Sequence, residues 1–333
     1  MLISFDSRAY FLSKLIKLKK ELNIRSIIAD YQFSILGEGS GPQNFLSELI
    51  NAIESNNLAK TTFNFLNSDL HLLNYGFYSP IWNKFNLKSK KKVMLRLDGM
   101  VIDSENINVE QKKYDFLKMV DKSAYIIYQS NFCKDCFTNT FDSLPIGKVI
   151  NNGASKLPPI TTFTKNNLKR INKIFKNSYF TVAGRFTSRK RIFEVICEFN
   201  EKNIGNLVVL SNVPKKFQYK NDRILYLGAL NSFTARHIIA NSNALIHFDK
   251  YDWCPNLVVN AIKDGTPIIC SNFGGTPEIT KNNGIIIEEF PKDLPCNIEG
   301  INYVKKAIFP SNLFKDTISL FNKKLYLNKS FDD

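Results

Sequence analysis

Residues 254–278 read CPNLVVNAIKDGTPIICSNFGGTPE, and this stretch contains the pattern that organises the second half of the chain. Apolar residues recur at helical spacing over 256–264, directly after a proline and an asparagine that suit a helix start. Gly265 suits the helix end, and the apolar run 266–270 is typical of a buried strand. Two glycines at 274–275 follow, and glycines allow a backbone to approach a ligand closely.

The same alternation of strand and helix extends over most of residues 179–289. Strands that alternate with helices indicate a parallel sheet covered on both faces, and ligands bind beyond the carboxyl ends of such strands. The expected strands are 179–184, 206–210, 223–228, 243–248, 266–270 and 284–289, and the expected helices are 188–201, 231–241 and 256–264.

The first half repeats this pattern less regularly, and at 333 residues the chain is too long for one hydrophobic core. We predict two doubly wound α/β domains, 1–160 and 161–333, joined by a proline-containing linker at 156–167. The last helix is a candidate to return to the first domain, and residues 1–24 are predicted to form an added helical segment. The expected elements of the first half are strands 26–31, 92–97, 124–129 and 148–153, helices 44–55 and 106–121, and a glycine-rich loop at 37–42.

Composition narrows the class of protein. Hydrophobic residues make up 44% and charged residues 23%, which is ordinary for a globular protein. No secretion signal or apolar run long enough to span a membrane is evident, so we expect a cytoplasmic protein.

Six cysteines include one CxxC at 133–136 and no second pair, so we expect no metal. The net charge of +15 favours an anionic partner.

Residues 10–22, YFLSKLIKLKKEL, form a basic amphipathic pattern. Such a helix can rest on the anionic inner face of a membrane, or it can pack on the first domain as an ordinary surface helix. The sequence leaves both alternatives open.

Four cations crowd the expected helix start that follows strand 179–184, where Ser188 is the candidate N-cap. A helix N-terminus disfavours positive side chains and offers N–H donors to anions. We therefore expect a phosphate or diphosphate at this position, the alternative being a solvated basic helix end. The four cations are Arg185, Arg189, Lys190 and Arg191.

Three motifs in this order resemble the GT-B glycosyltransferases of family 4: GRFTSRKR at 184–191, Asp252 with Asn260 eight residues later, and GGTPE at 274–278. The resemblance covers about 179–287 and extends only loosely to the first half. It implies two Rossmann-like domains facing a central cleft. It also implies the transfer of a hexose from a nucleotide sugar to a glycan or lipid-linked acceptor, as in polysaccharide biosynthesis, with retention of anomeric configuration and without a metal.

The resemblance also implies residue roles. Arg185 and Lys190 would bind the diphosphate and stabilise the negative charge of the leaving nucleotide, Asp252 would contact the transferred sugar, and Asn260 would contact the ribose. Asp98, which follows strand 92–97 beside Arg96, is a candidate contact to sugar or acceptor, or a turn residue before glycine. The other implied donor contacts are Gly39, Gly41, Leu230, Trp253, Cys254, Pro255, Asn256, Gly274, Gly275 and Glu278, of which Glu278 also suits a helix N-terminus.

The chain departs from the family pattern at two acidic positions. Asp252 is shorter than the usual glutamate, and Asn260 lacks the charge of one, although its amide can still hydrogen-bond to a ribose. The first domain also lacks the histidine that the family often carries near the reacting carbon. The alternative function is therefore a weak or inactive relative that binds nucleotide sugars or glycans. We expect a UDP- or GDP-sugar as substrate, no cofactor, and no nucleic-acid partner.

Overall fold

The computed structural model describes residues 2–5, 41–62, 69–74, 92–100, 109–121 and 123–329. The chain divides into two compact units, Met1–Ala154 and Ser155–Asp333. Each unit is built around its own six-stranded sheet, and all the strand pairs are parallel. Among the described helices, none has the length and apolar character needed to cross a membrane.

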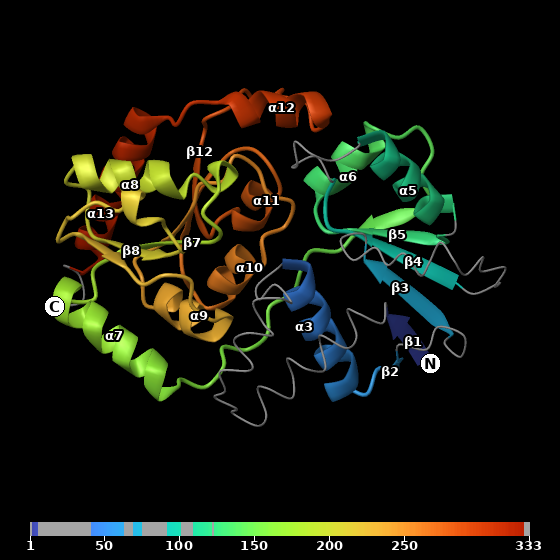
Figure 1. Cartoon of the computed structure of the whole chain (residues 1–333), viewed down its shortest axis with the longest axis horizontal. Coiled ribbons are helices and arrows are strands. Elements are labelled where there is room, and N and C mark those ends of the chain that lie inside the picture. The colour runs from blue at the N-terminus through green and yellow to red at the C-terminus, as the bar shows by residue number, and fades with distance from the viewer. Residues whose placement is uncertain are drawn as a thin grey trace. The chain divides into compact units, whose positions relative to one another are not determined.

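The sheet of the first unit has the strand order β2-β1-β3-β4-β5-β6 (Figure 1). Helix α3 packs on it through Ile50 and Ile53, which contact Leu72 of β3. Helices α5 and α6 meet through the rings of Phe116 and Phe137, whose centroids lie 5.1 Å apart with the planes tilted by 45°. The strands are β1 (Leu2–Phe5), β2 (Lys60–Thr62), β3 (Leu70–Asn74), β4 (Lys92–Leu97), β5 (Tyr125–Tyr128) and β6 (Gly147–Val149), and the helices are α3 (Gly41–Ser55), α5 (Val109–Asp121) and α6 (Asn131–Thr138).

The sheet of the second unit has the order β12-β11-β10-β7-β8-β9. The chain starts at β7 and moves outward to β9, then returns to place β10 on the other side of β7. This reversal is the topological switch point of a Rossmann-type sheet, where parallel α/β folds bind their ligands. The strands are β7 (Phe180–Ala183), β8 (Leu207–Leu210), β9 (Ile224–Tyr226), β10 (Leu245–His247), β11 (Ile268–Ser271) and β12 (Gly284–Ile287).

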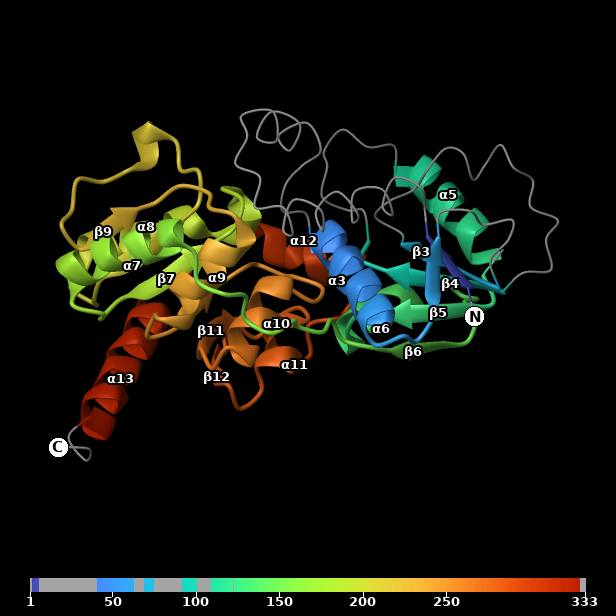
Figure 2. The ribbon, with the colours of Figure 1, turned by 90° about the horizontal axis from the view of Figure 1, so that it is seen from below.

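Helices cover both faces of this sheet (Figures 1 and 2). On one face the apolar sides of α8 and α13 pack on the strands, and on the other face α7, α9, α10 and α11 do so. The strands are buried on both sides, which explains their continuous apolar runs. The helices are α7 (Thr162–Phe175), α8 (Ile192–Glu201), α9 (Ser232–Ala240), α10 (Asn256–Lys263), α11 (Thr276–Thr280), α12 (Ile298–Lys306) and α13 (Ser311–Lys329).

The predicted elements of the second half are confirmed, with ends that differ by a few residues. The main correction concerns the helix expected at 188–201, because the chain first makes a single 3-10 turn, η3 (Ser188–Lys190), and α8 begins only at Ile192. Arg191 stands between the two in the left-handed conformation, with φ of 50°. Ser188 is therefore not the N-cap of α8.

Three other expectations need correction. Residues 2–5 form β1 of the first sheet, although the sequence placed them in an added helical segment. Half of the expected linker at 156–167 is helical, because α7 begins at Thr162. The last helix, α13, packs Phe314 and Ile318 into the core of the second unit.

Several predictions lie outside the described residues: the strand at 26–31, the basic helix at 10–22, and Gly39 of the glycine-rich loop. Gly41 of that loop is the first residue of α3. The short strands β2 and β3 and the helix α6 were not predicted.

Candidate functional site

The loops that follow β7 and β10 meet at the switch point of the second sheet. The backbone N–H of Lys250 donates to the carbonyl of Arg189 over 2.9 Å. The guanidinium of Arg189 in turn donates to the carbonyl of Tyr251 over 3.0 Å and lies 3.7 Å from a carboxylate oxygen of Asp252. These contacts fix the two loops against each other at the edge of the sheet where a ligand is expected.

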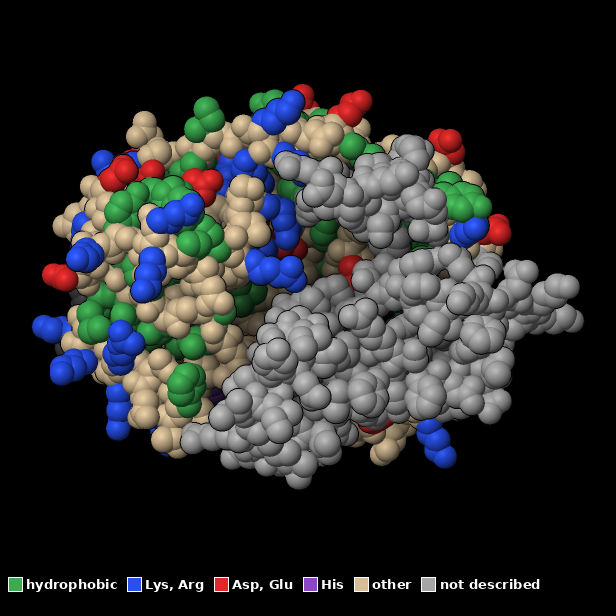
Figure 3. All heavy atoms as spheres, viewed as in Figure 1, with side chains coloured by type: hydrophobic (Ala, Val, Ile, Leu, Met, Phe, Trp, Pro, Cys, Tyr) green, Lys and Arg blue, Asp and Glu red, His purple; other side chains and the backbone are tan. Residues whose placement is uncertain are grey.

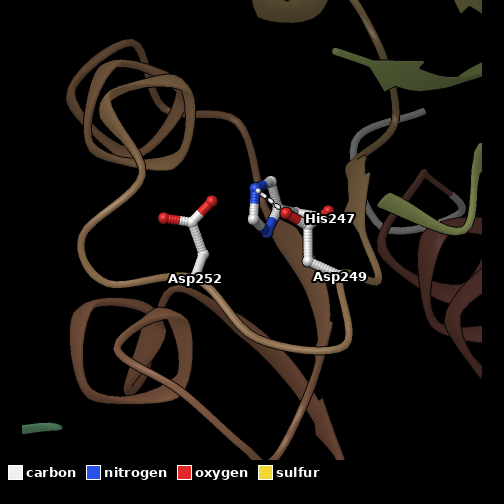
Figure 4. A group of neighbouring side chains, drawn as sticks. All are labelled: His247, Asp249 and Asp252. Carbon is white, nitrogen blue, oxygen red and sulfur yellow. Dashed lines mark ion pairs between the residues drawn. The ribbon is translucent and has the colours of Figure 1, made fainter. Parts of the chain in front are cut away.

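Lys190 lies between two aspartates of the β10–α10 loop. Its ammonium donates to Asp252 Oδ2 over 2.9 Å and also to Asp249 Oδ2. Asp249 is buried, and its backbone carbonyl accepts a hydrogen bond from Ser271 Oγ. Figure 4 shows both carboxylates beside the ring of His247, the last residue of β10.

Lys190 and Asp252 hold each other in the ionised state. Burial opposes the charge of Lys190, but Asp249 and Asp252 outweigh it and raise the pKa of the ammonium. Burial likewise opposes the charge of Asp252, but Lys190 and Arg189 outweigh it and hold the pKa of that carboxyl well below its usual range. Burial lowers the pKa of His247, so its imidazole is neutral near pH 7.

His247, Asp249 and Asp252 also bring their nitrogen and oxygen atoms within 4.8 Å of one another, which is close enough to hold a metal ion. The ammonium of Lys190 already bridges the two carboxylates and supplies the positive charge that a metal would bring. The chemistry of this group is therefore that of a buried ion-pair network.

The loop of Asp252 packs directly on the glycine turn after β11. The N–H of Gly275 donates to the carbonyl of Asp252 over 2.6 Å. A Cβ at Gly274, where φ is +98°, would lie only 2.9 Å from the backbone N and O of Asp252. Gly274 is therefore needed here so that two backbone segments can touch, and the approach of the glycine turn to a ligand stays a prediction.

Asn260 lies on α10 and presents an unusual polar atom. Its side-chain oxygen is buried and accepts no hydrogen bond from any of the described residues. A buried acceptor without a donor costs about 1–3 kcal/mol, so such an atom marks a place where a ligand hydroxyl would be stabilising.

The expectation that four cations share one anion at this helix start needs correction. Arg191 is completely buried, and its guanidinium forms two hydrogen bonds of 2.6 and 2.8 Å to Glu289. Arg191 is thus part of the core, while Lys190 and Arg189 contact aspartates of the next loop. Arg185 is exposed, and among the described residues no ion pair involves its side chain. Carboxylates of the protein itself therefore neutralise three of the four cations for which the sequence predicted a bound anion.

The other predicted donor contacts are distributed around this edge of the sheet. Trp253, Cys254 and Pro255 are buried, and Asn256 is the first residue of α10. The N–H of Trp253 donates to Asp252 Oδ1 over 2.7 Å. Leu230 follows β9 and packs partly against the core, away from the loops after β7 and β10.

Glu278 lies in the first turn of α11, which is where the helix dipole favours an acid. A structural role at this helix start is therefore available to Glu278 in addition to the donor contact that the resemblance implies.

In the first unit, Asp98 follows β4 and forms an ion pair with Arg96. Arg96 is buried, donates to Asn152 Oδ1 over 2.6 Å and to Gln129 Oε1 over 3.3 Å, and stacks on the ring of Phe45 at 3.5 Å from its centroid. These residues join the carboxyl ends of β4, β5 and β6. The carboxylate of Asp98 is thereby held by a structural partner, and its contact to sugar or acceptor stays a prediction.

Sequence reasoning missed Asp249, His247 and Glu289. Asp249 and His247 could have been identified from the sequence, because both lie at the carboxyl end of the apolar strand 243–248, just before Asp252. No sequence pattern pointed to Glu289, because its partner Arg191 was itself assigned to the anion site.

No family model matches the sequence, and no protein with a curated description matches it either. Several solved structures are similar to the structure of this chain. The complex of HepE of Anabaena with UDP and glucose superposes with a TM-score of 0.57 at 13% identity, covering 99% of both chains. Sucrose-phosphate synthase of Thermosynechococcus elongatus superposes with a TM-score of 0.53 at 14% identity, covering 90% of this chain and 82% of the other.

The chain has the GT-B fold. Its structural neighbours are GT-B glycosyltransferases, and HepE has also been solved with UDP-glucose, at a TM-score of 0.57 and 12% identity to this chain. At such identities the likeness establishes the two Rossmann-like domains of the GT-B fold. Activity must be argued from the site.

Proposed function

We propose that this GT-B protein is a glycosyltransferase that moves a hexose from a nucleotide sugar to an acceptor hydroxyl. The observation that carries this proposal is the cluster of Arg189, Lys190 and Asp252 at the switch point of the second sheet, against the glycine turn 274–275. Cations and an ionised carboxylate at one edge of the sheet suit the diphosphate and the sugar of such a donor.

The diphosphate binds beside Lys190 and Arg189, with the exposed Arg185 as a further cation. The ammonium of Lys190 is shared between two carboxylates in the protein alone, so an entering phosphate competes with Asp249 and Asp252 for it. In the transition state negative charge develops on the leaving nucleoside diphosphate, and a fixed ammonium at that position stabilises it.

Asp252 stays ionised because Lys190 and Arg189 hold its pKa low. It can therefore accept hydrogen bonds from sugar hydroxyls, with its backbone fixed by Gly275 and its Oδ1 oriented by the N–H of Trp253. On α10 the unpartnered oxygen of Asn260 accepts from a ribose hydroxyl. A neutral amide gives this contact less strength than the carboxylate of the family pattern would give.

The reaction proceeds with retention and without a protein base or a metal. A phosphate oxygen of the donor takes the proton of the attacking hydroxyl, and Lys190 provides the charge that a metal would otherwise bring to the diphosphate. The donor is a UDP- or GDP-hexose, and the complexes of HepE with UDP and with UDP-glucose favour UDP. The acceptor is a glycan or a lipid-linked sugar.

A second candidate function is a binding protein with little or no turnover. It is favoured by Asn260, which stands where the family pattern has an acid. Asn260→Glu separates the two candidates. A gain in turnover of roughly a hundredfold or more would mark the natural protein as a weakened relative, and a change within about tenfold supports a working enzyme adapted to the amide.

Binding is tested by thermal denaturation of the full chain with UDP, GDP and their hexose derivatives. A ligand at one hundred times its Kd stabilises the folded state by about 2.7 kcal/mol, which moves the melting temperature by several degrees. We expect one nucleotide series to stabilise the wild type and to have a weaker effect on Arg185→Ala. If no nucleotide or nucleotide sugar changes the melting temperature, the proposal is wrong.

A further inference from the structure

A long acid-free segment crosses the start of the second unit. Residues 143–193 contain eleven lysines and arginines and no aspartate or glutamate. The candidate site uses the cations from Arg185 onward, but those of α7 lie on a different element and have no role there. Helix α7 itself carries Lys165, Lys169, Arg170 and Lys173, with Lys176 at its C-cap.

One side of α7 is fixed in the core and the other side is open. Thr164, Ile171 and Phe175 are buried, and Thr164 Oγ1 hydrogen-bonds Thr234 of α9 over 2.9 Å. The helix α9 on which α7 packs also contains no acidic residue, so it brings no carboxylate to the cations. Among the described residues, no ion pair involves a cation of α7.

The surface over α7 can be followed in Figure 3. Lysine and arginine side chains gather along the lower left edge of the molecule, over the position that α7 occupies in Figure 1. Lys169 and Lys173 are exposed neighbours four residues apart on the helix, and Arg170 lies beside Lys173.

Large apolar side chains accompany this charge. Phe163 is 48% exposed, Ile174 is 47% exposed, and Ile160, just before the helix, is 40% exposed. Phe163, Arg170 and Ile174 follow one another along the same side of the helix at spacings of seven and four residues. Exposed aromatic and aliphatic side chains among lysines are costly in water. They suit a binding partner whose surface is charged and whose interior is apolar.

We propose that the open side of α7 docks on an anionic lipid bilayer. The cations lie at the level of the lipid phosphates, and Phe163, Ile174 and Ile160 enter the boundary of the acyl chains. A nucleic acid or another polyanion would use the charge but would leave these apolar side chains in water, so the lipid surface accounts for more of what the helix presents. This surface is distinct from the basic pattern at 10–22, which lies outside the described residues, and it does not depend on the proposed enzymatic function.

The test is co-sedimentation of the full chain with vesicles of phosphatidylcholine alone and with 30% phosphatidylglycerol. We expect binding only to the anionic vesicles, weakening as salt is added. The triple variant Lys169→Ser, Arg170→Ser, Lys173→Ser should bind about a hundredfold more weakly, since each cation near such a surface contributes about a factor of five. The triple variant Lys215→Ser, Lys216→Ser, Lys220→Ser, on and after η4 (Lys215–Phe217), is the control matched for lost charge and should change binding less than tenfold.

The double variant Phe163→Ser, Ile174→Ser keeps every cation and tests the apolar part of the proposal. We expect it to bind anionic vesicles at least tenfold more weakly than the wild type. Equal binding of this variant and the wild type would overturn the proposal and leave simple adsorption of a basic protein to anions. The proposal is also overturned if the triple variant binds like the wild type.

A second measurement does not depend on comparing affinities. In Phe163→Trp, the new indole should be quenched by brominated acyl chains when anionic vesicles are present, more strongly than the fluorescence of the wild type. Absence of that additional quenching while the protein is bound would place another surface on the membrane and contradict the proposal.

Discussion

Each of the two sheets has a cation at the carboxyl ends of its strands, the buried Arg96 and the half-buried Lys190, and the two cations have different surroundings. Arg96 in the first unit is enclosed by two amides, one carboxylate and an aromatic ring. Lys190 in the second unit contacts two carboxylates, with the guanidinium of Arg189 close to one of them. The contacts of Arg96 are directional and suit a planar guanidinium. The contacts of Lys190 are ion pairs, which depend mainly on charge and distance.

The difference suits a structural role for Arg96 and, under the proposed function, a ligand-binding role for Lys190. The planar guanidinium of Arg96 fits four neighbours at fixed angles, so any ligand that displaced it would break the joint between β4, β5 and β6. The ammonium of Lys190 is a point charge, and a phosphate can take the place of either aspartate without new geometry. Substitutions at Arg96 and around Lys190 test this difference from either side.

The largest effect is expected from Arg96→Met. This change leaves Asp98, Asn152 and Gln129 without their shared donor, and breaking such a buried pair typically costs about 3–5 kcal/mol of unfolding free energy. Denaturation in urea measures it, with the exposed Arg185→Ala as control, for which we expect a change within about 0.5 kcal/mol. A neutral outcome at Arg96 would mean that its contacts are not structural.

Next in size is the effect of Lys190→Ala on turnover. Removing a fixed charge that stabilises the leaving group typically lowers kcat about 10²–10³-fold. The release of nucleoside diphosphate from the donor measures it, and Lys216→Ala is a control on an exposed lysine of the same unit. If Lys190→Ala loses stability but keeps its turnover, Lys190 has a structural role like that of Arg96. The proposed difference between the two cations would then be wrong.

A smaller effect, opposite in sign, is expected from Asp249→Asn. The amide keeps the shape of the side chain but no longer competes with a phosphate for Lys190. We expect the Kd for the nucleoside diphosphate to fall by about tenfold, which corresponds to about 1.4 kcal/mol. Calorimetric titration measures it. Weaker binding in this variant would show instead that Asp249 is needed to position the ammonium.

The smallest predicted effect is a pH dependence of stability that comes from His247. Burial lowers the pKa of this imidazole in the folded state, so below about pH 6.5 the unfolded chain takes up a proton first. Stability is therefore lost as the pH falls from 6.5, by at most about 1.4 kcal/mol per pH unit. His247→Gln should flatten the dependence between pH 6.5 and 5. The lowered pKa of Asp252 contributes only below about pH 4.

The strands and helices of the second unit could be predicted because their apolar periodicity and glycine stops are strong local signals. A close approach at the glycine turn could also be predicted, because such contact restricts the residue type, but the sequence assigned it to a ligand and the structure shows Gly274 against the backbone of Asp252. The pairing of charges could not be predicted. Arg191 and Lys190 are adjacent in sequence, yet one turns into the core towards Glu289 and the other towards Asp249, because a left-handed residue separates η3 from α8.

The most direct test of the account is the release of nucleoside diphosphate when the purified chain is given UDP- and GDP-hexoses with extracts that contain acceptors. The account predicts release from at least one donor, increased by the extract and lowered at least a hundredfold in Lys190→Ala. Donors that remain intact under all these conditions, with wild type and variant alike, would contradict the claim that the cluster around Lys190 serves glycosyl transfer.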